Sequence, residues 1–494
     1  MRLGLLKFLA LMTYFVLSFA HADQFAFAGK LVDSRTNGYT YGYGPSIIYE
    51  NGRYNMFYCS TGSNGAWDAV RYVSSSDGNT WSAPTIALGA NTGATGDTAA
   101  CDPSVVRYQA PGDAQPYYYL FYSGYVASQQ TVIYVARSLN ISGPYEKWTG
   151  GSNWALNPAN PKYIIAPNHA QTSSSFYGAG EQTVVVVNNQ LQMWYSDDTG
   201  ISTRPGDACA GPCMHLFMTS AIGGNPTQWS APTLTTGTGS IESVDVKYND
   251  AQKTYVMYST PNKHQANAYL VEQVSVNGID WSSQTVLCNT NCYGGANFPA
   301  YSGNVGVSGD SQGHTIGNRT LVGYAAPYES GCTGNCWGQW DLFGGIVYSP
   351  AADTAPLTSA QSNSILWPVS ALIDADYLSS YSSAVFPGAT NANTFVAAWT
   401  AGQSVVRAIR LYARDINGKM QGFPPSYNVY LTAADNSSWV PIGTFSQQPD
   451  VTGVATITLP TSMATYGILI YPVTFGADNY GNRVFQLNGI ELVK

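Results

Sequence analysis

One short aromatic strand pattern occurs five times in the first 350 residues, and this repeat constrains the fold most strongly. The five copies read NMFYCS at 55–60, YYLFYSG at 118–124, LQMWYSD at 191–197, TYVMYST at 254–260 and TLVGYAA at 320–326. An alternating strand precedes each copy across a turn containing Asn, Asp or Gly, as in a β-hairpin. A third strand follows each copy and ends in a serine, such as Ser75 or Ser138.

A tryptophan marks the beginning of a fourth strand after four of the copies. These residues are Trp81, Trp148, Trp229 and Trp281. We expect them to pack between neighbouring sheets, because large aromatic side chains dominate buried cores. Three or four strands repeated five times, with variable loops between them, are typical of radial repetition. The repeat therefore predicts an all-β chain with a five-bladed β-propeller over residues 23–355.

The C-terminal segment at 365–494 lacks the repeat. A stretch rich in Pro, Ala and Ser precedes it, which predicts a domain boundary with a linker at 356–364. Short alternating strands then return, for example SYNVYLTAA and VATITLP. They predict a second domain, a β-sandwich of the jelly-roll type.

Residues 1–22 have the features of a secretory signal peptide. Two basic residues are followed by an apolar stretch at 8–20 and by the small-residue pattern AHA at 20–22. The pattern predicts cleavage, and the apolar stretch is short for the alternative, a membrane anchor. No later segment has the roughly 18 apolar residues that a membrane span needs. We therefore expect a secreted or periplasmic protein with no membrane span.

The eight cysteines predict four local disulfides. Zinc binding is the alternative, but the cysteine loops lack His at ligand spacing, and an exported chain favours disulfides. Six cysteines lie in three CxxxC loops, and the expected pairs are Cys59/Cys101, Cys209/Cys213, Cys288/Cys292 and Cys332/Cys336.

The charge of the chain disfavours several kinds of partner. Its net charge is −8 at pH 7, only 10% of its residues are charged, and no basic run is present. Nucleic acid and anionic membranes attract basic surfaces, so neither is expected here. The histidines show no metal-site spacing, so no metal or cofactor is required, although a structural calcium ion is not excluded. We expect a monomer.

Acidic residues recur where the first strand of a blade begins. This strand lies beside the axis of a propeller, so its first residue points toward the central funnel. Alignment of the blades on this strand puts five residues at matched positions, namely Gly44, Asp102, Glu181, Glu242 and Gly303. Three successive blades thus present a carboxylate to the funnel.

The motif DPSVV at 102–106, Glu181 at the start of the third blade and turns such as SSDGNTW resemble glycoside hydrolase family 43 and its five-bladed relatives. The resemblance covers residues 26–350. It implies that Glu181 matches the general acid and Asp102 the aspartate that orients and tunes it. The activity it implies is hydrolysis of polysaccharides or oligosaccharides that contain arabinose, xylose or galactose. The family's general base begins the first blade, where this chain has Gly44.

Gly44 leaves three interpretations open. The base is lost, and the propeller binds carbohydrate without cleaving it. Alternatively, the triad is rotated by one blade, so that Asp102, Glu181 and Glu242 serve as base, tuning residue and acid. In the third interpretation a loop carboxylate, Asp68, replaces the base. A sialidase-like enzyme is disfavoured because the blades lack three matched arginines.

The loops around the funnel are expected to supply side chains that bind sugar. Aromatic faces stack on sugar rings, and polar groups bond the hydroxyls. The candidates are Trp67, Asp68, His169, Tyr177, Arg204, His264, Trp337 and Trp340.

The run FPPSYNVYLTAADNSSWVPIGTF at 423–445, with FQLNGIELV at 485–493, resembles the discoidin-like sandwich, the coagulation factor type C fold. Many carbohydrate-binding modules use this fold. The resemblance covers most of residues 365–494 and implies a module that keeps the protein on its polysaccharide.

Overall fold

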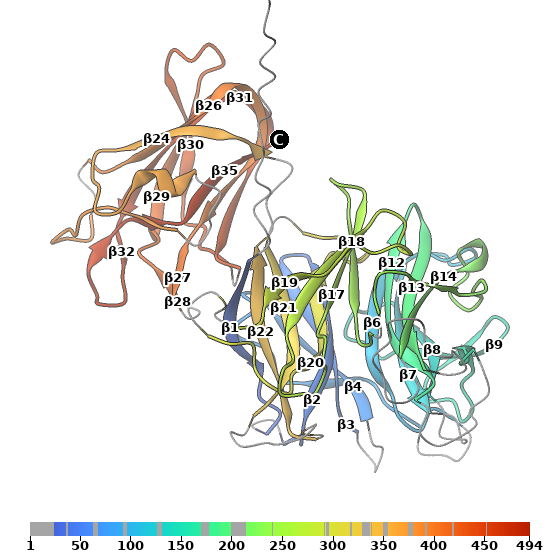
Figure 1. The fold of residues 1–494 in the computed structure, drawn as a ribbon. Helices are drawn as coiled ribbons and strands as arrows, with labels where there is room; N and C mark the ends of the chain where they lie inside the picture. The colour runs from blue at the N-terminus through green and yellow to red at the C-terminus, as the bar shows by residue number, and fades with distance from the viewer. Residues whose placement is uncertain are drawn as a thin grey trace, which may run out of the picture.

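The structure is a computed structural model, and its described elements are β-strands apart from two 3-10 turns, Ile222–Gly224 and Val369–Leu372 (Figure 1). The prediction of an all-β chain is confirmed. The chain positions at 1–22, including the expected signal peptide, lie outside the described residues. The structure describes residues 24–35, 38–62, 68–91, 96–125, 131–168, 177–198, 214–239, 241–290, 292, 296–316, 319–328, 336, 338–348, 354–373, 379–390, 393–416, 419–450 and 452–494.

Five four-stranded antiparallel units follow one another between residues 24 and 348. Each unit begins with a hairpin made of the repeated strand and the strand before it, as the sequence predicts. The strands of the first unit are β2 (Gly42–Glu50), β3 (Arg53–Thr61), β4 (Asp68–Ser75) and β5 (Thr85–Leu88). Those of the second are β6 (Cys101–Tyr108), β7 (Tyr117–Tyr125), β8 (Thr131–Ser138) and β9 (Glu146–Gly150), with β10 (Asn153–Ala155) and β11 (Tyr163–Ile165) paired to β9 and β8.

The remaining units repeat this plan. The third contains β12 (Ala179–Val187), β13 (Gln190–Asp197), β14 (His215–Ser220) and β15 (Thr233–Leu234). The fourth contains β16 (Asp245–Asn249), β17 (Thr254–Ser259), β18 (Leu270–Ser275) and β19 (Thr285–Cys288). The fifth contains β20 (Gly303–Gly309), β21 (Arg319–Pro327), β22 (Trp340–Tyr348) and, from the N-terminal end of the chain, β1 (Gln24–Val32), which pairs with β22.

The first strands of the five units contact one another in a cycle. Strand β2 contacts β6, β6 contacts β12, β12 contacts β16, and β16 contacts β20. Strand β20 then pairs in parallel with β2 at Ile47 and Ile48. These strands therefore surround one central space.

Side chains on the first strands bond each unit to the next. In four units a hydroxyl or carboxylate oxygen accepts the backbone N–H of the following unit. The donor and acceptor residues are Val105 and Ser46, Val184 and Ser104, Val246 and Thr183, and Val307 and Asp245. The fifth unit has Gly306 instead, whose added β-carbon would lie 1.7 Å from the Pro45 carbonyl oxygen. Only a glycine permits this close approach of β20 to β2.

The turn at 310–315 covers the far end of the first strands. The backbone N–H groups of Arg107, Val186 and Tyr248 donate to carbonyls of this turn. The His314 ring nitrogens lie 2.6 Å from the Asp250 carboxylate and 2.6 Å from the Val186 carbonyl oxygen. The turn therefore connects four of the five units at the end opposite to where their first strands begin.

Hydrophobic clusters fill the interfaces between neighbouring units. Trp281 is buried in the cluster between the third and fourth units and lies 6.4 Å from Trp194. The other predicted tryptophans, Trp81, Trp148 and Trp229, are partly buried and pack against such clusters. The prediction that these residues are structural is confirmed.

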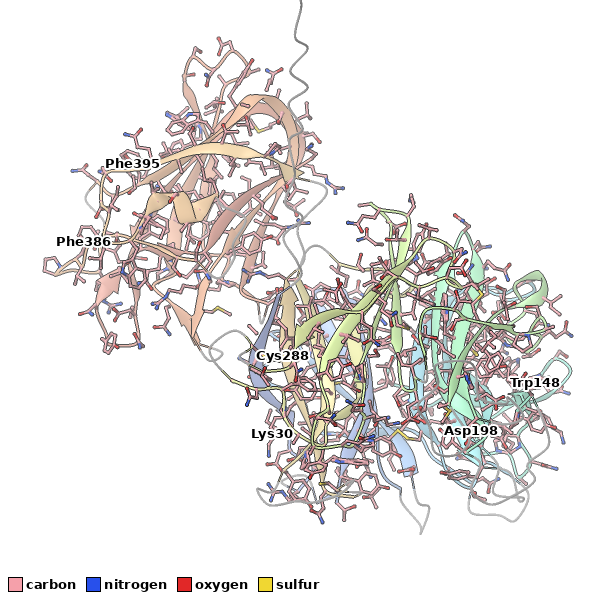
Figure 2. The ribbon with its side chains drawn as sticks, in the orientation of Figure 1. Lys30, Trp148, Asp198, Cys288, Phe386 and Phe395 are labelled. Atoms are coloured by element: carbon pink, nitrogen blue, oxygen red, sulfur yellow. A yellow bond between two sulfur atoms is a disulfide. The ribbon has the colours of Figure 1, made fainter. Side chains whose placement is uncertain are left out.

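Two predicted disulfides are present among the described residues. Cys59–Cys101 joins β3 of the first unit to β6 of the second, and Cys288–Cys292 closes a local loop after β19 (Figure 2). Cys336 is also disulfide-bonded. The other members of the predicted pairs, Cys209, Cys213 and Cys332, lie outside the described residues.

The C-terminal region is a separate arrangement of strands. Its main sheet has the order β23-β35-β26-β31-β29-β30, with β24 paired to β26. The predicted linker at 356–364 contains β24, so this segment belongs to the sheet. The strands are β23 (Thr354–Ala355), β24 (Leu357–Ser362), β25 (Tyr381–Ser382), β26 (Val396–Tyr412), β27 (Arg414–Ile416), β28 (Lys419–Gln421), β29 (Ser426–Thr432), β30 (Trp439–Phe445), β31 (Val454–Thr474), β32 (Gly476–Ala477), β33 (Arg483–Val484), β34 (Gln486–Leu487) and β35 (Gly489–Val493).

The C-terminal region packs against the first and fifth units (Figure 1). Arg319 of β21 donates to the Thr452 carbonyl, and its guanidinium lies 4.2 Å from the centre of the Tyr412 ring. Tyr412 and Val454 also join a hydrophobic cluster of the first and fifth units. Within the described part of the chain, no helix has the length and apolar character to span a membrane.

Candidate functional site

A distorted residue occurs at the same place in all five units, where the first strand begins. These residues adopt a positive φ that L-amino acids rarely use, and they are Gly44 (59°), Asp102 (45°), Glu181 (52°), Ser243 (53°) and Asn304 (50°). In four of the units the strand register also shifts around this residue, as in a β-bulge. A bulge redirects a side chain, and all five residues line the central space.

Backbone geometry corrects the sequence alignment in the fourth and fifth units. The alignment predicted Glu242 and Gly303 at the matched positions, but the structure puts Ser243 and Asn304 there. The strand pattern does not record which residue adopts the positive φ, so the alignment was wrong by one residue. Glu242 is therefore not related by rotation to Asp102 and Glu181, which removes the geometric basis of the rotated triad.

A cavity of about 280 Å³, here called the central cavity, lies where the first strands begin. It collects four carboxylates and one lysine from four units. Trp67, His169, Arg204 and Trp337 lie outside the described residues. The cavity is lined by Tyr43, Asp68, Ala99, Cys101, Asp102, Ser123, Gly124, Tyr125, Thr131, Tyr177, Glu181, Met214, Glu242, Lys263, His264, Asn304 and Trp340.

Lys263, between β17 and β18, forms the electrostatic centre of this cavity. Its ammonium group donates to the Glu181 carboxylate and, at 2.6 Å, to Ser243 Oγ. The Lys263 Nζ atom also lies 3.6 Å from Glu242 Oε1. Burial tends to lower the pKa of Lys263, but the charges of Glu181 and Glu242 outweigh it and raise that pKa well above the usual value. Lys263 therefore stays charged and compensates these carboxylates.

Glu181 presents one engaged and one open carboxylate oxygen. Its Oε1 atom contacts Lys263, whereas its buried Oε2 has no hydrogen-bond partner among the described residues. The Glu181 backbone N–H donates to Ser123 Oγ at 2.9 Å, which holds the bulge in place. The open oxygen can bond a group that enters the cavity.

Asp102 lies beside Glu181 in the second unit. The Tyr177 hydroxyl donates to Asp102 Oδ2 at 3.2 Å. Burial, and next the negative charge of Glu181, raise the pKa of Asp102 to about 7. Asp102 can therefore hold a proton near neutral pH.

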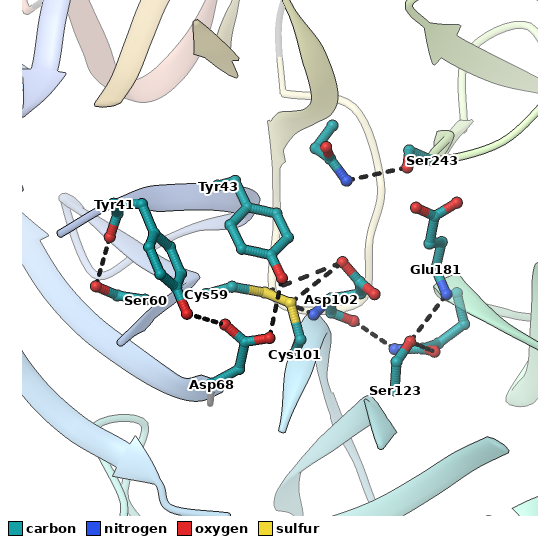
Figure 3. The surroundings of a disulfide bond; sticks show 12 residues. Tyr41, Tyr43, Cys59, Ser60, Asp68, Cys101, Asp102, Ser123, Glu181 and Ser243 are labelled. Carbon is teal, nitrogen blue, oxygen red and sulfur yellow. Dashed lines mark hydrogen bonds between the residues drawn. A yellow bond between two sulfur atoms is a disulfide. The ribbon is translucent and has the colours of Figure 1, made fainter. Parts of the chain in front are cut away.

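Asp68 opens β4 on the other side of the Cys59–Cys101 disulfide (Figure 3). Tyr41 donates to Asp68 Oδ1 at 2.6 Å, and Tyr43 donates to Oδ2 at 3.1 Å. Burial raises the pKa of Asp68 to about 6, although the two tyrosine hydrogen bonds lower it. The Tyr43 hydroxyl lies between Asp68 and Asp102, so these two carboxylates share one wall of the cavity (Figure 3).

Gly44 leaves little room for a side chain. An added β-carbon would lie 3.2 Å from Asp102 Oδ1 and 3.3 Å from Cys59 Sγ. Its φ of 59° is close to that of the four matched residues, which carry side chains, so the backbone conformation alone does not require a glycine. The disulfide and Asp102 therefore crowd the position from which a base at residue 44 would project.

The predicted aromatic and histidine residues differ in how they contact the cavity. Tyr177 and His264 line the cavity as expected. Trp340 also lines it, but it is 1% exposed and stacks on the His264 ring with the ring centres 4.3 Å apart. Burial, and next the charge of Lys263, lower the pKa of His264 to about 3, so this ring is neutral. Trp340 thus packs against His264, whereas we expected the face of its ring to be open for stacking on a sugar.

One group of possible metal ligands occurs among the described residues, namely Cys59, Cys101 and Asp102. The two sulfurs are bonded to each other in a disulfide, so only the carboxylate could serve as a ligand. This group does not fit a metal ion. The calcium ion left open by the sequence stays untested.

Sequence reasoning missed Lys263, Tyr43, Ser123 and Asn304. Lys263 directly precedes the predicted His264 in the loop PNKHQ. Its place in the connection between the second and third strands could therefore have identified it as a residue near the funnel. Tyr43 directly precedes Gly44, and only the bulge directs it toward the cavity.

The sequence matches no protein-family model and no curated protein. Among solved structures it is similar to an α-L-arabinofuranosidase of Podospora anserina, determined in complex with cellotriose. The identity is 16% and the TM-score 0.48, with coverage of 67% of this chain and 98% of that one. A family 117 glycoside hydrolase of Zobellia galactanivorans has 12% identity and a TM-score of 0.46, with coverage of 67% of this chain and 92% of that one.

An exo-β-1,3-galactanase of Phanerochaete chrysosporium is similar over 96% of this chain and 100% of its own, with 13% identity and a TM-score of 0.43. These structural neighbours are glycoside hydrolases. At such identities and TM-scores, the likeness assigns neither activity nor substrate to this chain.

Proposed function

We propose that the five units form a five-bladed β-propeller and that its central cavity is the active site of a glycoside hydrolase. Its substrates are polysaccharides or oligosaccharides that contain arabinose, xylose or galactose. One observation carries the proposal: Asp102 and Glu181 project from matched bulges of adjacent units into one cavity, with Lys263 and Glu242 beside them. The cyclic contacts of the first strands support the propeller.

The chemistry of this pair suits glycosidic bond cleavage. Hydrolysis needs a protonated carboxyl that donates to the leaving oxygen. Burial, and next the charge of Glu181, raise the pKa of Asp102 to about 7, and Glu181 Oε2 has no hydrogen-bond partner among the described residues. Glu181 is proposed to donate the proton through this oxygen, with Asp102 beside it as the residue that tunes it. Glu242, with a side chain that is 35% exposed, contacts substrate at the cavity mouth.

Release of reducing sugar from arabinan, arabinoxylan and galactan oligosaccharides tests this proposal. The Glu181→Gln and Asp102→Asn variants should lose on the order of 10²–10⁴-fold in rate, as expected for general acid–base catalysis. Asp280→Asn is the matched control, because this exposed carboxylate lies in an outer turn of the fourth unit. Equal rates for Glu181→Gln and the control would contradict the proposed role.

A second candidate function is carbohydrate binding without cleavage, and Gly44 favours it. The position of the expected base has no carboxylate, and an added β-carbon there would lie only 3.2 Å from Asp102 Oδ1. In that case isothermal calorimetry would detect binding of the same oligosaccharides, while no sugar would be released by the wild-type protein.

The C-terminal region is proposed to be a discoidin-like carbohydrate-binding module of an exported protein. Its strands enclose a hydrophobic core of their own, which supports a separate module. Export agrees with the disulfides Cys59–Cys101 and Cys288–Cys292, which persist in oxidising compartments. Affinity electrophoresis of the whole chain and of residues 24–350 in polysaccharide gels would compare retention with and without this region.

A further inference from the structure

We infer that Asp68, the first residue of β4 in the first unit, is the general base of the reaction. This inference rests on the proposed function, and it names the group that activates water. It also explains why the chain keeps a catalytic arrangement although position 44 is a glycine.

Position 44 offers little space for a catalytic side chain. The Cys59–Cys101 disulfide and Asp102 lie within 3.3 Å of a β-carbon added at Gly44. A side chain at position 44 would therefore be crowded by them. A base for this cavity must come from a neighbouring backbone segment, and Asp68 is the remaining cavity carboxylate of the first unit.

The position of Asp68 in the central cavity suits a base. Asp68 is 3% exposed, yet it lines the same cavity as Asp102 and Glu181. It projects from the start of β4, next to the disulfide, whereas Glu181 projects from the third unit. Figure 3 shows Asp68 and Glu181 on opposite sides of the Asp102 carboxylate. Substrate in the cavity would thus contact an acid and a base from different directions.

Two hydrogen bonds fix the orientation of the Asp68 carboxylate. Both carboxylate oxygens of Asp68 accept tyrosine hydroxyls, from Tyr41 and Tyr43. Each oxygen has a second lone pair that can accept a proton from water. The two hydrogen bonds stabilise the ionised carboxylate and fix its plane. These hydrogen bonds hold Asp68 in the form and orientation of a base. Among the hydrogen bonds of the described residues, none joins a lysine or arginine to its carboxylate oxygens.

The proposed reaction balances with water as the only co-reactant. Asp68 removes a proton from a water molecule as the water oxygen bonds to the anomeric carbon. The bond from that carbon to the glycosidic oxygen breaks, and the leaving oxygen takes a proton from the Glu181 carboxyl. Solvent then returns the proton from Asp68 to Glu181.

Two substitutions at Asp68 test the inference. Asp68→Asn and Asp68→Ala should lower kcat on the order of 10²–10⁴-fold with little change in KM, because they remove a proton acceptor and leave the sugar contacts in place. Formate should restore part of the rate of Asp68→Ala by supplying a carboxylate to the vacated space. Thermal unfolding of each variant confirms that it is folded.

A third variant separates a base from a structural aspartate. Tyr41→Phe removes a hydrogen bond that lowers the pKa of Asp68, and Tyr41 is not a cavity residue. A base acts in its ionised form, so activity falls as the pH decreases through its pKa. In Tyr41→Phe this acid limb of kcat/KM should move upward from about pH 6. A merely structural aspartate would leave the limb where it is.

The outcomes are distinguishable. Full activity of folded Asp68→Asn in an active wild-type background overturns the role of Asp68 and leaves the glycosidase proposal standing. An unshifted acid limb in Tyr41→Phe also overturns that role. A wild-type protein that binds these oligosaccharides and cleaves none overturns both proposals.

Discussion

Replacing Lys263 by methionine should destabilise the protein in a strongly pH-dependent manner. Lys263 is 10% exposed and contacts the Glu181 carboxylate, which is 8% exposed. Methionine keeps much of the volume but leaves Glu181 without its cation. Breaking a buried ion pair by removing one partner costs about 3–5 kcal/mol, because the remaining charge is buried without compensation.

The pH dependence follows from the carboxylate that is left. Without Lys263 the charge of the buried Glu181 carboxylate is uncompensated, so folding costs free energy when this group is ionised. The stability of the variant relative to wild type therefore falls as the pH increases and the carboxyl loses its proton. The decrease in the free energy of unfolding relative to wild type should thus be largest at pH 8 and should shrink as the pH approaches 4.

Urea unfolding at several pH values, followed by tryptophan fluorescence, measures this loss. Lys253→Met is the matched control, because Lys253 is 70% exposed and pairs with Asp250 at 3.5 Å. Such a surface pair contributes about 0–1 kcal/mol. A Lys263→Met variant as stable as wild type at pH 8, or a loss that is equal at every pH, would refute the reasoning.

Three further predictions follow from the fold. Gly306→Ala should prevent folding or lower the melting temperature sharply in calorimetry, since its β-carbon would lie 1.7 Å from the Pro45 carbonyl oxygen; an unchanged melting temperature would contradict the close contact of β20 and β2. Removal of the Cys59–Cys101 disulfide in a Cys59→Ala/Cys101→Ala variant should cost about 4 kcal/mol in chemical unfolding, because the bond closes a loop with a sequence separation of 42. A loss near zero would contradict this estimate. Gly44→Asp should lower sugar release, since its β-carbon would lie 3.2 Å from Asp102 Oδ1 and crowd that carboxylate; a gain in rate would show that position 44 has room for a base.

The repeated strand made much of the architecture predictable. Its five copies located the hairpins, and the alternation of apolar residues defined the buried faces that pack between units. Asp102 and Glu181 were found because each directly begins a recognisable first strand. Cys59 and Cys101 paired as predicted, although their partnership depends on the proximity of two units.

The features that sequence reasoning missed depend on backbone geometry or on distant loops. Ser243 and Asn304 have the positive φ that marks the matched position, and the strand pattern does not record this geometry. A one-residue change reverses the direction of a strand side chain. Lys263 reaches Glu181 across a sequence separation of 82 residues, which no local pattern records. Trp340 was expected to face ligand, but His264 covers its ring. Each of these contacts arises from the tertiary arrangement of the units.

A paired measurement on wild type and Glu181→Gln tests the central claim most directly. Calorimetry would measure oligosaccharide binding, and a reducing-end assay on the same samples would measure cleavage. The account predicts that both proteins bind with similar affinity and that only the wild type releases sugar. Equal release by both proteins, or binding by both with no release by either, would contradict the claim that this cavity is a glycosidase active site.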